Sequence, residues 1–119
     1  MEVRYASKTV EQQCTSVKAA NKLFGGKKIL TEKLMSRVNA LKAAPNLKDI
    51  VLMKNLRFHD LEGDLSGLFA IDVKTQKDKW RIILRPLDQD ENEFNPCNID
   101  EIAEIVKIIR IEKVSAHYE

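Results

Sequence analysis

The most constraining feature of this sequence is a change in its hydrophobic period near residue 55. Before that point apolar residues recur at helical spacing, as Val10, Cys14 and Val17 do in a predicted helix that ends at Gly25-Gly26. After it, apolar and polar residues alternate, which is typical of a half-buried strand. Such a chain has to pack helices against a sheet, because each element has one apolar face to bury.

The helical part of the chain divides into two predicted helices. The first begins near Thr9, which with Gln12 has the spacing of a capping box. The second begins near Thr31 and ends at Pro45. Because the link between them is short, we expect the two helices to fold back on each other as an antiparallel hairpin.

Five segments have the composition of strands. They are residues 3–7, 56–61, 68–73, 79–87 and 107–114, with an acidic loop at 87–97. Asn98 with Glu101 predicts a brief helical turn before the last strand. We therefore expect an α+β fold: a small, antiparallel-rich sheet of about five strands, backed by the N-terminal two-helix hairpin. The other face of the sheet would then be available for a ligand.

Length and composition bound the class of protein. A chain of 119 residues with 44% apolar content is expected to form one domain, residues 1–119, with a real core. No run approaches the roughly 20 apolar residues of a membrane span, and the N-terminus lacks the apolar core of a signal peptide, so we expect a cytoplasmic protein. Cys14 and Cys97 form neither a CxxC motif nor a disulfide framework. We expect idle thiols and no metal or other cofactor.

The charges are distributed unevenly although the net charge is only +2. Residues 86–104 hold seven of the 18 acidic residues and no lysine or arginine. The rest of the chain holds all 20 basic residues against 11 acidic ones, a balance of +9. A basic body attracts anionic partners such as nucleic acid through its long-range field.

Basic side chains repeat on two of the predicted strands. Alternation puts Arg81 and Arg85 on one face of the strand at 79–87, about 13 Å apart. It likewise puts Arg57 and His59 on one face of the strand at 56–61. Arginine offers a planar fork that suits phosphate oxygens, although the same pattern also fits solvated arginines on a half-exposed strand.

These residues, with a histidine near the end of the chain, would suit RNA cleavage by the substrate's own 2′-hydroxyl. That reaction needs a base for the hydroxyl, an acid for the departing 5′-oxygen and cations for the phosphorane. His59 or Glu62 could be the base, His117 the acid, and Arg81 and Arg85 the cations. A structural histidine at 59 and a polar tail at 117 remain the simpler interpretations of each residue taken alone.

Two motifs give the sequence a resemblance to a known family. The segments RFHDLEGDLSGLFAIDV at 57–73 and WRIILRP at 80–86, followed by a last strand and a histidine, resemble the RelE/ParE superfamily of bacterial toxins. More narrowly they resemble its HigB-type, or plasmid maintenance killer, branch. The resemblance extends over nearly the whole chain. It implies a RelE-like fold and a type II toxin that cleaves mRNA on the ribosome, an mRNA interferase that inhibits translation and growth.

The resemblance also implies roles for individual residues. By position, Arg81 would contact the scissile phosphate, His117 would be the general acid, and His59 stands where one branch has its general base. Arg57, Arg85 and Tyr118 are candidates for binding RNA or phosphate.

One position departs from the family pattern. Glu62 stands where many family nucleases carry a lysine. Either Glu62 takes the role of the base, or cleavage is weaker than in the lysine-bearing members.

The resemblance further implies partners. These are a cognate helix-turn-helix antitoxin (HigA-like), mRNA in the ribosomal A site, and operator DNA reached through the antitoxin, with no membrane partner. The alternative is a toxin of the same fold that acts by protein binding, as gyrase poisons do, because a fold does not determine a function. A plain RNA-binding module would explain the basic body without explaining two histidines.

Overall fold

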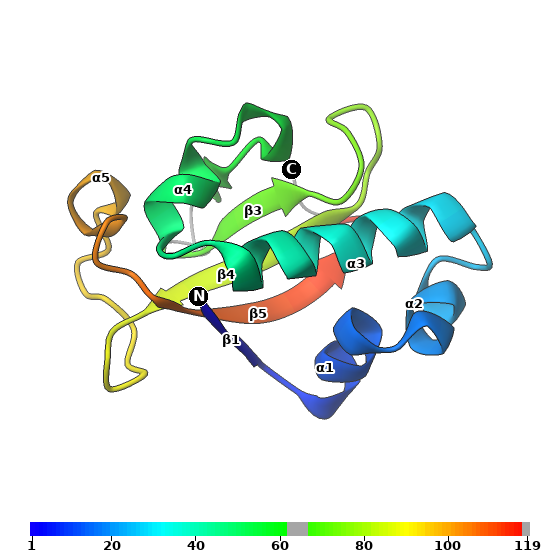
Figure 1. Ribbon diagram of the computed structural model, residues 1–119, viewed down its shortest axis with the longest axis horizontal. Coiled ribbons are helices and arrows are strands. Elements are labelled where there is room, and N and C mark those ends of the chain that lie inside the picture. Colours follow the sequence, from blue (N-terminus) through cyan, green and yellow to red (C-terminus); the bar gives the residue numbers. More distant parts are fainter. Residues whose placement is uncertain (62–66, 118–119) are drawn as a thin grey trace.

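The computed structural model describes residues 1–61 and 67–117, which form helices packed against a sheet (Figure 1). Its elements in chain order are β1 (Glu2–Tyr5), α1 (Lys8–Thr15), α2 (Val17–Leu23), α3 (Lys28–Ala43), α4 (Leu47–Val51), the 3-10 turn η1 (Lys54–Leu56), β2 (His59–Asp60), β3 (Phe69–Asp72), β4 (Arg81–Leu87), α5 (Ile99–Ile102) and β5 (Ile108–Ser115). The predicted α+β class is confirmed.

The five strands form one mixed sheet in the order β1-β5-β4-β3-β2. Strands β2 to β5 are antiparallel neighbours in chain order, which is the expected meander. β1 instead joins β5 in parallel, with Glu2 opposite Ile108. The first and last strands of the chain are therefore side by side, and β5 lies inside the sheet rather than at its edge.

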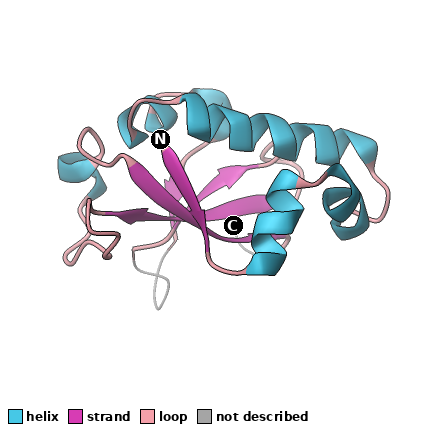
Figure 2. Cartoon of the chain, turned by 60° about the horizontal axis from the view of Figure 1, so that its bottom comes forward, coloured by secondary structure: helices cyan, strands magenta, loops and turns pink. Residues whose placement is uncertain are grey.

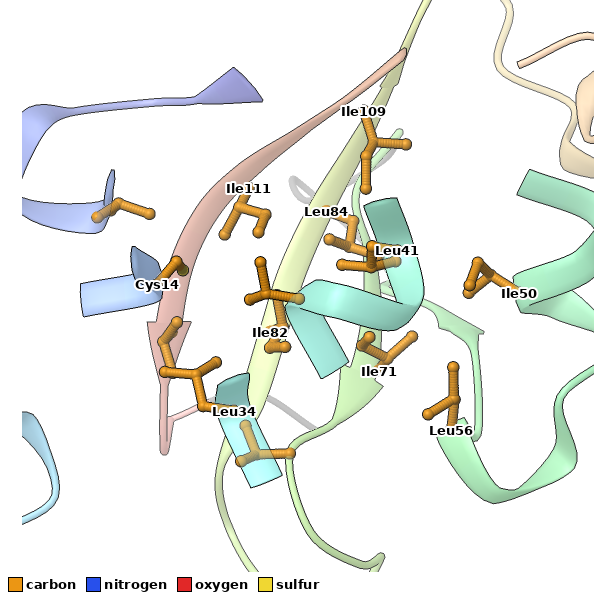
Figure 3. Packing of buried hydrophobic residues seen from close by; sticks show 14 of the residues in the cluster. Cys14, Leu34, Leu41, Ile50, Leu56, Ile71, Ile82, Leu84, Ile109 and Ile111 are labelled. Carbon is orange, nitrogen blue, oxygen red and sulfur yellow. The ribbon is translucent and has the colours of Figure 1, made fainter. Parts of the chain in front are cut away.

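The long helix α3 covers one face of the sheet (Figure 2). Its fully buried residues Leu34 and Leu41 belong to the same core cluster as Ile82, Leu84 and Ile111 of the sheet (Figure 3). Burying a side chain of this size stabilises the fold by about 1.5–3 kcal/mol. Alternation along β4 decides which residues reach this core, because Ile82 and Leu84 point the same way.

The first predicted helix is in fact two helices that meet at Ser16. The Ser16 hydroxyl accepts a hydrogen bond from the Ala19 amide at 3.2 Å and so begins α2, while its own amide bonds the Gln12 carbonyl and ends α1. The predicted capping box at Thr9 is wrong. The residue that caps α1 is Ser7, which is extended and accepts from the Val10 amide at 3.2 Å.

The second predicted helix is longer than expected and is followed by another. Gly25 and Gly26 both have positive φ, which reverses the chain so tightly that α3 begins at Lys28, three residues before Thr31. α3 ends before Pro45, as predicted. The sequence-based interpretation missed α4, which Asn46 caps by accepting from the Asp49 amide.

The acidic loop folds back on arginines of its own chain. Glu91 lies 2.8 Å from Arg4, and Glu93 lies 2.6 Å from Arg85. Part of the charge asymmetry seen in the sequence is thus compensated within the molecule. Within residues 1–61 and 67–117, no helix is both long enough and apolar enough to cross a membrane.

Candidate functional site

The sheet face turned away from α3 carries three cross-strand rows of side chains. Its apolar members are Leu61, Ala70 and Ile83, which form a small core separate from the main one. The rows follow from the strand register. The first consists of Arg57, Asp72, Arg81 and Ser115, the second of His59, Ala70, Ile83 and Lys113, and the third includes Arg85 and Arg110. The face is therefore partly filled, and only its polar positions remain available to a ligand.

Asp72 is the centre of the first row and is only 2% exposed. Arg57 grips it with two hydrogen bonds of 3.0 Å, from Nε to Oδ2 and from Nη2 to Oδ1. Arg81 Nε lies 3.2 Å from Oδ1 as an ion pair, although its angle is too poor for a hydrogen bond. Two guanidiniums around one carboxylate keep the cluster positive overall, and a buried carboxylate requires such partners.

Arg37 of α3 joins this cluster from the other side. Its Nε donates to the Asp72 carbonyl at 3.1 Å and its Nη2 to the Lys74 carbonyl at 3.3 Å. Burial lowers the pKa of the Arg37 guanidinium, and the Asp72 charge partly offsets that effect. Arg37 thereby ties the end of β3 to the helix layer.

Arg81 is buried and holds the turn between β3 and β4. Its Nη1 donates to the carbonyls of Asp78 and Trp80, and its Nη2 donates to the Gln76 carbonyl at 3.1 Å. Only 7% of its side chain is exposed. In this state both terminal nitrogens of Arg81 are engaged by the protein itself. Its predicted contact with a scissile phosphate stays a prediction, and would need those bonds to be exchanged.

Arg57 and His59 are coupled through the backbone. Arg57 has a left-handed backbone with φ 50°, which is costly for a residue with a side chain. Its carbonyl oxygen lies 2.7 Å from His59 Nδ1. Because a carbonyl only accepts, Nδ1 carries the proton, and in the neutral ring Nε2 is then the acceptor nitrogen. This is the tautomer that a general base acting through Nε2 would need.

His117 follows β5 at the Arg81 end of the face. Its side chain is exposed, and its amide donates to Ser115 Oγ at 3.1 Å. Ser115 is the register partner of Arg81. The structure thus brings Arg57, Arg81 and Ser115 into one row, with His117 two residues beyond Ser115. His59 lies in the next row on the edge strand β2, and β3 and β4 separate it from β5. Glu62 and Tyr118, the other two predicted site residues near them, lie outside the described residues.

Arg85 lies four residues further along β4 and is bound differently from Arg81. Its Nη1 pairs with Glu93 at 2.6 Å. Its Nε is buried without a hydrogen bond, and the nearest carboxylate oxygen on Glu112 is 3.8 Å away. The protein therefore leaves part of the hydrogen-bonding capacity of Arg85 unused.

The two thiols do not have the properties of nucleophiles. Burial raises the pKa of Cys14 to about 12, with a small opposing effect from Lys42. Burial also raises the pKa of the half-buried Cys97, and Asp60 adds to the shift. In the part of the chain that the structure describes, no three His, Cys, Asp or Glu side chains come together as metal ligands would.

Sequence reasoning missed the residue that organises this face. Asp72 was passed over as part of the apolar strand LFAIDV, yet a lone carboxylate in such a strand must be buried and so must have cationic partners. A lone carboxylate in an apolar strand predicts an ion pair, but it does not indicate which arginines form that pair. The sequence did not indicate that Arg37 contacts Asp72, because Arg37 lies on a helix far from Asp72 along the chain.

Comparison with known proteins adds no relative to this picture. No family model matches the sequence, and no curated protein is similar to it. The HigB-type resemblance therefore rests on the sequence motifs themselves, chiefly those at 57–73 and 80–86.

Proposed function

We propose that this protein is the toxin of a type II toxin–antitoxin system, a HigB-type endoribonuclease that cleaves mRNA on the ribosome without a metal. The observation that supports this most directly is that Arg57, His59 and Arg81 lie in neighbouring rows of one sheet face, with His117 two residues beyond Ser115, the register partner of Arg81. Those are residue types that cleavage through the 2′-hydroxyl requires.

In this proposal His59 Nε2 takes the proton of the substrate's 2′-hydroxyl. The 2′-oxygen attacks the adjacent phosphorus, the bond from phosphorus to the 5′-oxygen breaks, and His117 gives a proton to that oxygen. The products are a 2′,3′-cyclic phosphate and a 5′-hydroxyl. Glu62 is the other candidate for the base.

The cationic role in this proposal falls first on Arg57. Its side chain is 31% exposed, against 7% for Arg81, and Lys113 is exposed in the neighbouring row. Arg81 acts through Asp72, which both arginines share. It is then a positioning residue that keeps Arg57 aimed at the substrate, rather than the phosphate ligand that the resemblance implies.

The test is RNA 5′-end mapping after induced expression. The wild type should halt translation and produce new 5′ ends at codon boundaries, while His59→Gln and His117→Gln should produce none. Lys33→Ala, an exposed substitution on α3, is the matched control and should behave as the wild type. Unchanged cleavage in both histidine variants would refute the proposal.

A second experiment tests the nucleophile. Ribosomes programmed with an mRNA that carries a single 2′-deoxy nucleotide at the mapped site should leave that site intact, while neighbouring sites are still cut. Cleavage at the 2′-deoxy position would exclude attack by the 2′-hydroxyl.

The proposed partners are mRNA in the ribosomal A site and a helix-turn-helix antitoxin of the HigA type, through which the complex would reach operator DNA. A short helix-turn-helix gene in the adjacent reading frame would support this assignment. Co-purification of that gene product with the toxin would test it directly.

One observation favours a different candidate function, a toxin of the same fold that acts by protein binding. Both terminal nitrogens of Arg81 are engaged by the β3–β4 turn. A protein-binding toxin needs no free arginine at that position. Growth arrest that persists in a His59→Gln/His117→Gln double variant, together with inhibited supercoiling by purified gyrase, would establish this alternative.

A further inference from the structure

A polar pocket lies beside the proposed catalytic face, at its Arg85 end. Its volume is about 650 Å³, and it is lined by Gly67, Arg85, Glu93, Phe94, Asn95, Pro96 and Cys97. The loop that closes it returns alongside β4, because Glu93 forms a bridge with Leu87. No residue of this pocket except Arg85 belongs to the catalytic cluster proposed above.

The pocket is one row away from His59. His59 shares a row with Ile83 two strands away, about 10 Å across the sheet, and Arg85 is two residues beyond Ile83 on β4, about 7 Å along the strand. The Cys97 thiol, on the pocket wall, is close enough to Asp60 and Arg85 for both charges to act on it. An RNA strand held at His59 would therefore place a neighbouring nucleotide at this pocket.

The lining of the pocket offers three kinds of contact to a nucleobase. The Arg85 side chain is 18% exposed and its Nη1 lies 2.6 Å from Glu93, so the pocket presents a guanidinium donor beside a carboxylate acceptor. Phe94 lines the pocket and is half-buried because it packs against the main core. Its aromatic ring is therefore held in place at the pocket wall. Aromatic rings bind bases by stacking, and arginine forks donate to adjacent acceptors on a base edge.

A donor and a carboxylate side by side select among the bases. Guanine alone carries two neighbouring N–H donors, N1–H and N2–H, on the edge that also carries the O6 acceptor. A carboxylate can accept from both donors while the guanidinium donates to O6. Adenine offers no such pair of donors next to an oxygen acceptor.

We propose that this pocket is a guanine-binding subsite that sets sequence preference next to the cleaved phosphate. The inference rests on the proposed function for its role in cleavage, but binding itself can be measured without cleavage. Gly67 keeps the entrance open to Arg85, because a Cβ there would lie 3.3 Å from Arg85 Nη1, and its backbone has φ 84°.

The test is titration of the full-length protein with GMP, AMP, CMP, UMP and inorganic phosphate, followed by two-dimensional amide NMR. GMP should bind about tenfold more tightly than AMP, and its shifts should centre on residues 85 and 93–97. Glu93→Gln should remove the preference for GMP over AMP, and Phe94→Leu should weaken all four nucleotides. Glu91→Gln, in the same loop but paired with Arg4, is the control and should leave the preference unchanged.

Three results would overturn the inference: no binding of GMP at millimolar concentration, equal affinity for GMP and AMP, or a preference that survives Glu93→Gln. If inorganic phosphate displaced GMP with the same affinity, the pocket would bind phosphate rather than guanine, and the inference would also be overturned. Failure of the proposed function gives a different result. If GMP binds selectively and RNA is never cut, the subsite stands and the nuclease does not; if RNA is cut with no guanine preference and GMP does not bind, only the subsite fails.

Discussion

Asp72 shows how one buried carboxylate can organise a sheet face. It receives two hydrogen bonds from Arg57 and an ion pair from Arg81, and its carbonyl receives a further bond from Arg37. A buried carboxylate of this kind stabilises the fold only while its partners remain, and the partners depend equally on it. The costly left-handed backbone of Arg57 is one consequence, since it lets that residue bond Asp72 and His59 at the same time.

Replacing Asp72 by Asn should destabilise the protein by about 3–5 kcal/mol, because two guanidiniums would lose their buried counter-charge. Urea unfolding followed by circular dichroism measures the effect. Glu104→Gln is the matched control, since Glu104 is 4.0 Å from Lys48 in an exposed pair, and it should change stability by less than about 1 kcal/mol. Equal midpoints for Asp72→Asn and the wild type would contradict this account.

Cys14 should make stability fall at high pH. Its pKa is raised by burial from 9.0 to about 12, so on raising the pH the unfolded chain loses the thiol proton first. The contribution is fully present below about pH 9 and is lost as the pH rises towards 12, at up to about 1.4 kcal/mol per pH unit. Urea unfolding between pH 8 and 11 should show a steeper decline for the wild type than for Cys14→Ala. Parallel curves would show that Cys14 does not titrate in this way.

At the scale of elements, short polar residues decide where the helices begin and end. Ser7, Ser16 and Asn46 each accept an amide hydrogen bond at the start of a helix. Ser16 also lies at the end of the preceding helix, so it separates α1 from α2. The break between two helices is thus encoded by a single residue.

Ser16→Ala should cost about 1 kcal/mol, the usual value for an N-cap. Ser36→Ala, at an exposed position inside α3, removes the same hydroxyl without removing a cap and should change stability by less than about 0.5 kcal/mol. Both are measured by urea unfolding. An equal effect of the two substitutions would mean that Ser16 does not act as a cap.

Strands were easier to predict from the sequence than helix ends. The apolar segments 68–73 and 79–87 contain β3 and β4, and 107–114 contains all of β5 except Ser115, because alternation over several residues is a repeated signal. Helix ends depend on single hydrogen bonds, and the predicted cap at Thr9 lies two residues beyond Ser7, the residue that caps α1. β2 is only two residues long because the left-handed backbone at Arg57 precedes it, and no pattern in LRFHDL indicates that conformation.

The candidate site was only partly predictable for a similar reason. Alternation put Arg81 and Arg85 on one face, as they are in β4. Arg57 lies outside β2, and its hydrogen bonds to Asp72 rather than strand alternation bring it to this face. Alternation could not show that Arg57, Asp72 and Arg81 share one row, since that depends on the register among three strands. Alternation also could not show that both terminal nitrogens of Arg81 are engaged by backbone carbonyls of the β3–β4 turn.

At the scale of the whole molecule, β5 is the strand on which the sheet depends most. It has β1 on one side and β4 on the other, whereas β1 and β2 are edges. Interior strands open only with the whole fold, while edges open locally at lower cost. The stability of this protein should therefore rise from the edges of the sheet towards β4 and β5.

Amide hydrogen exchange followed by NMR can check this gradient. Amides of Ile82, Leu84 and Ile111 should exchange at the slowest rates, near the limit set by global unfolding, and those of β1 and β2 should exchange much faster. Protection of Val3 equal to that of Ile111 would show that the parallel pair does not open on its own.

The parallel pairing of β1 with β5 has a consequence for how the protein is made. Glu2 meets Ile108 across an intervening stretch of about a hundred residues, so β1 leaves the ribosome long before its partner has been translated. β5 also leads directly to His117, so the completion of the sheet and the arrival of the proposed acid coincide. In the function proposed above, a nascent chain would therefore have neither the complete sheet nor the proposed acid until its last strand has been translated.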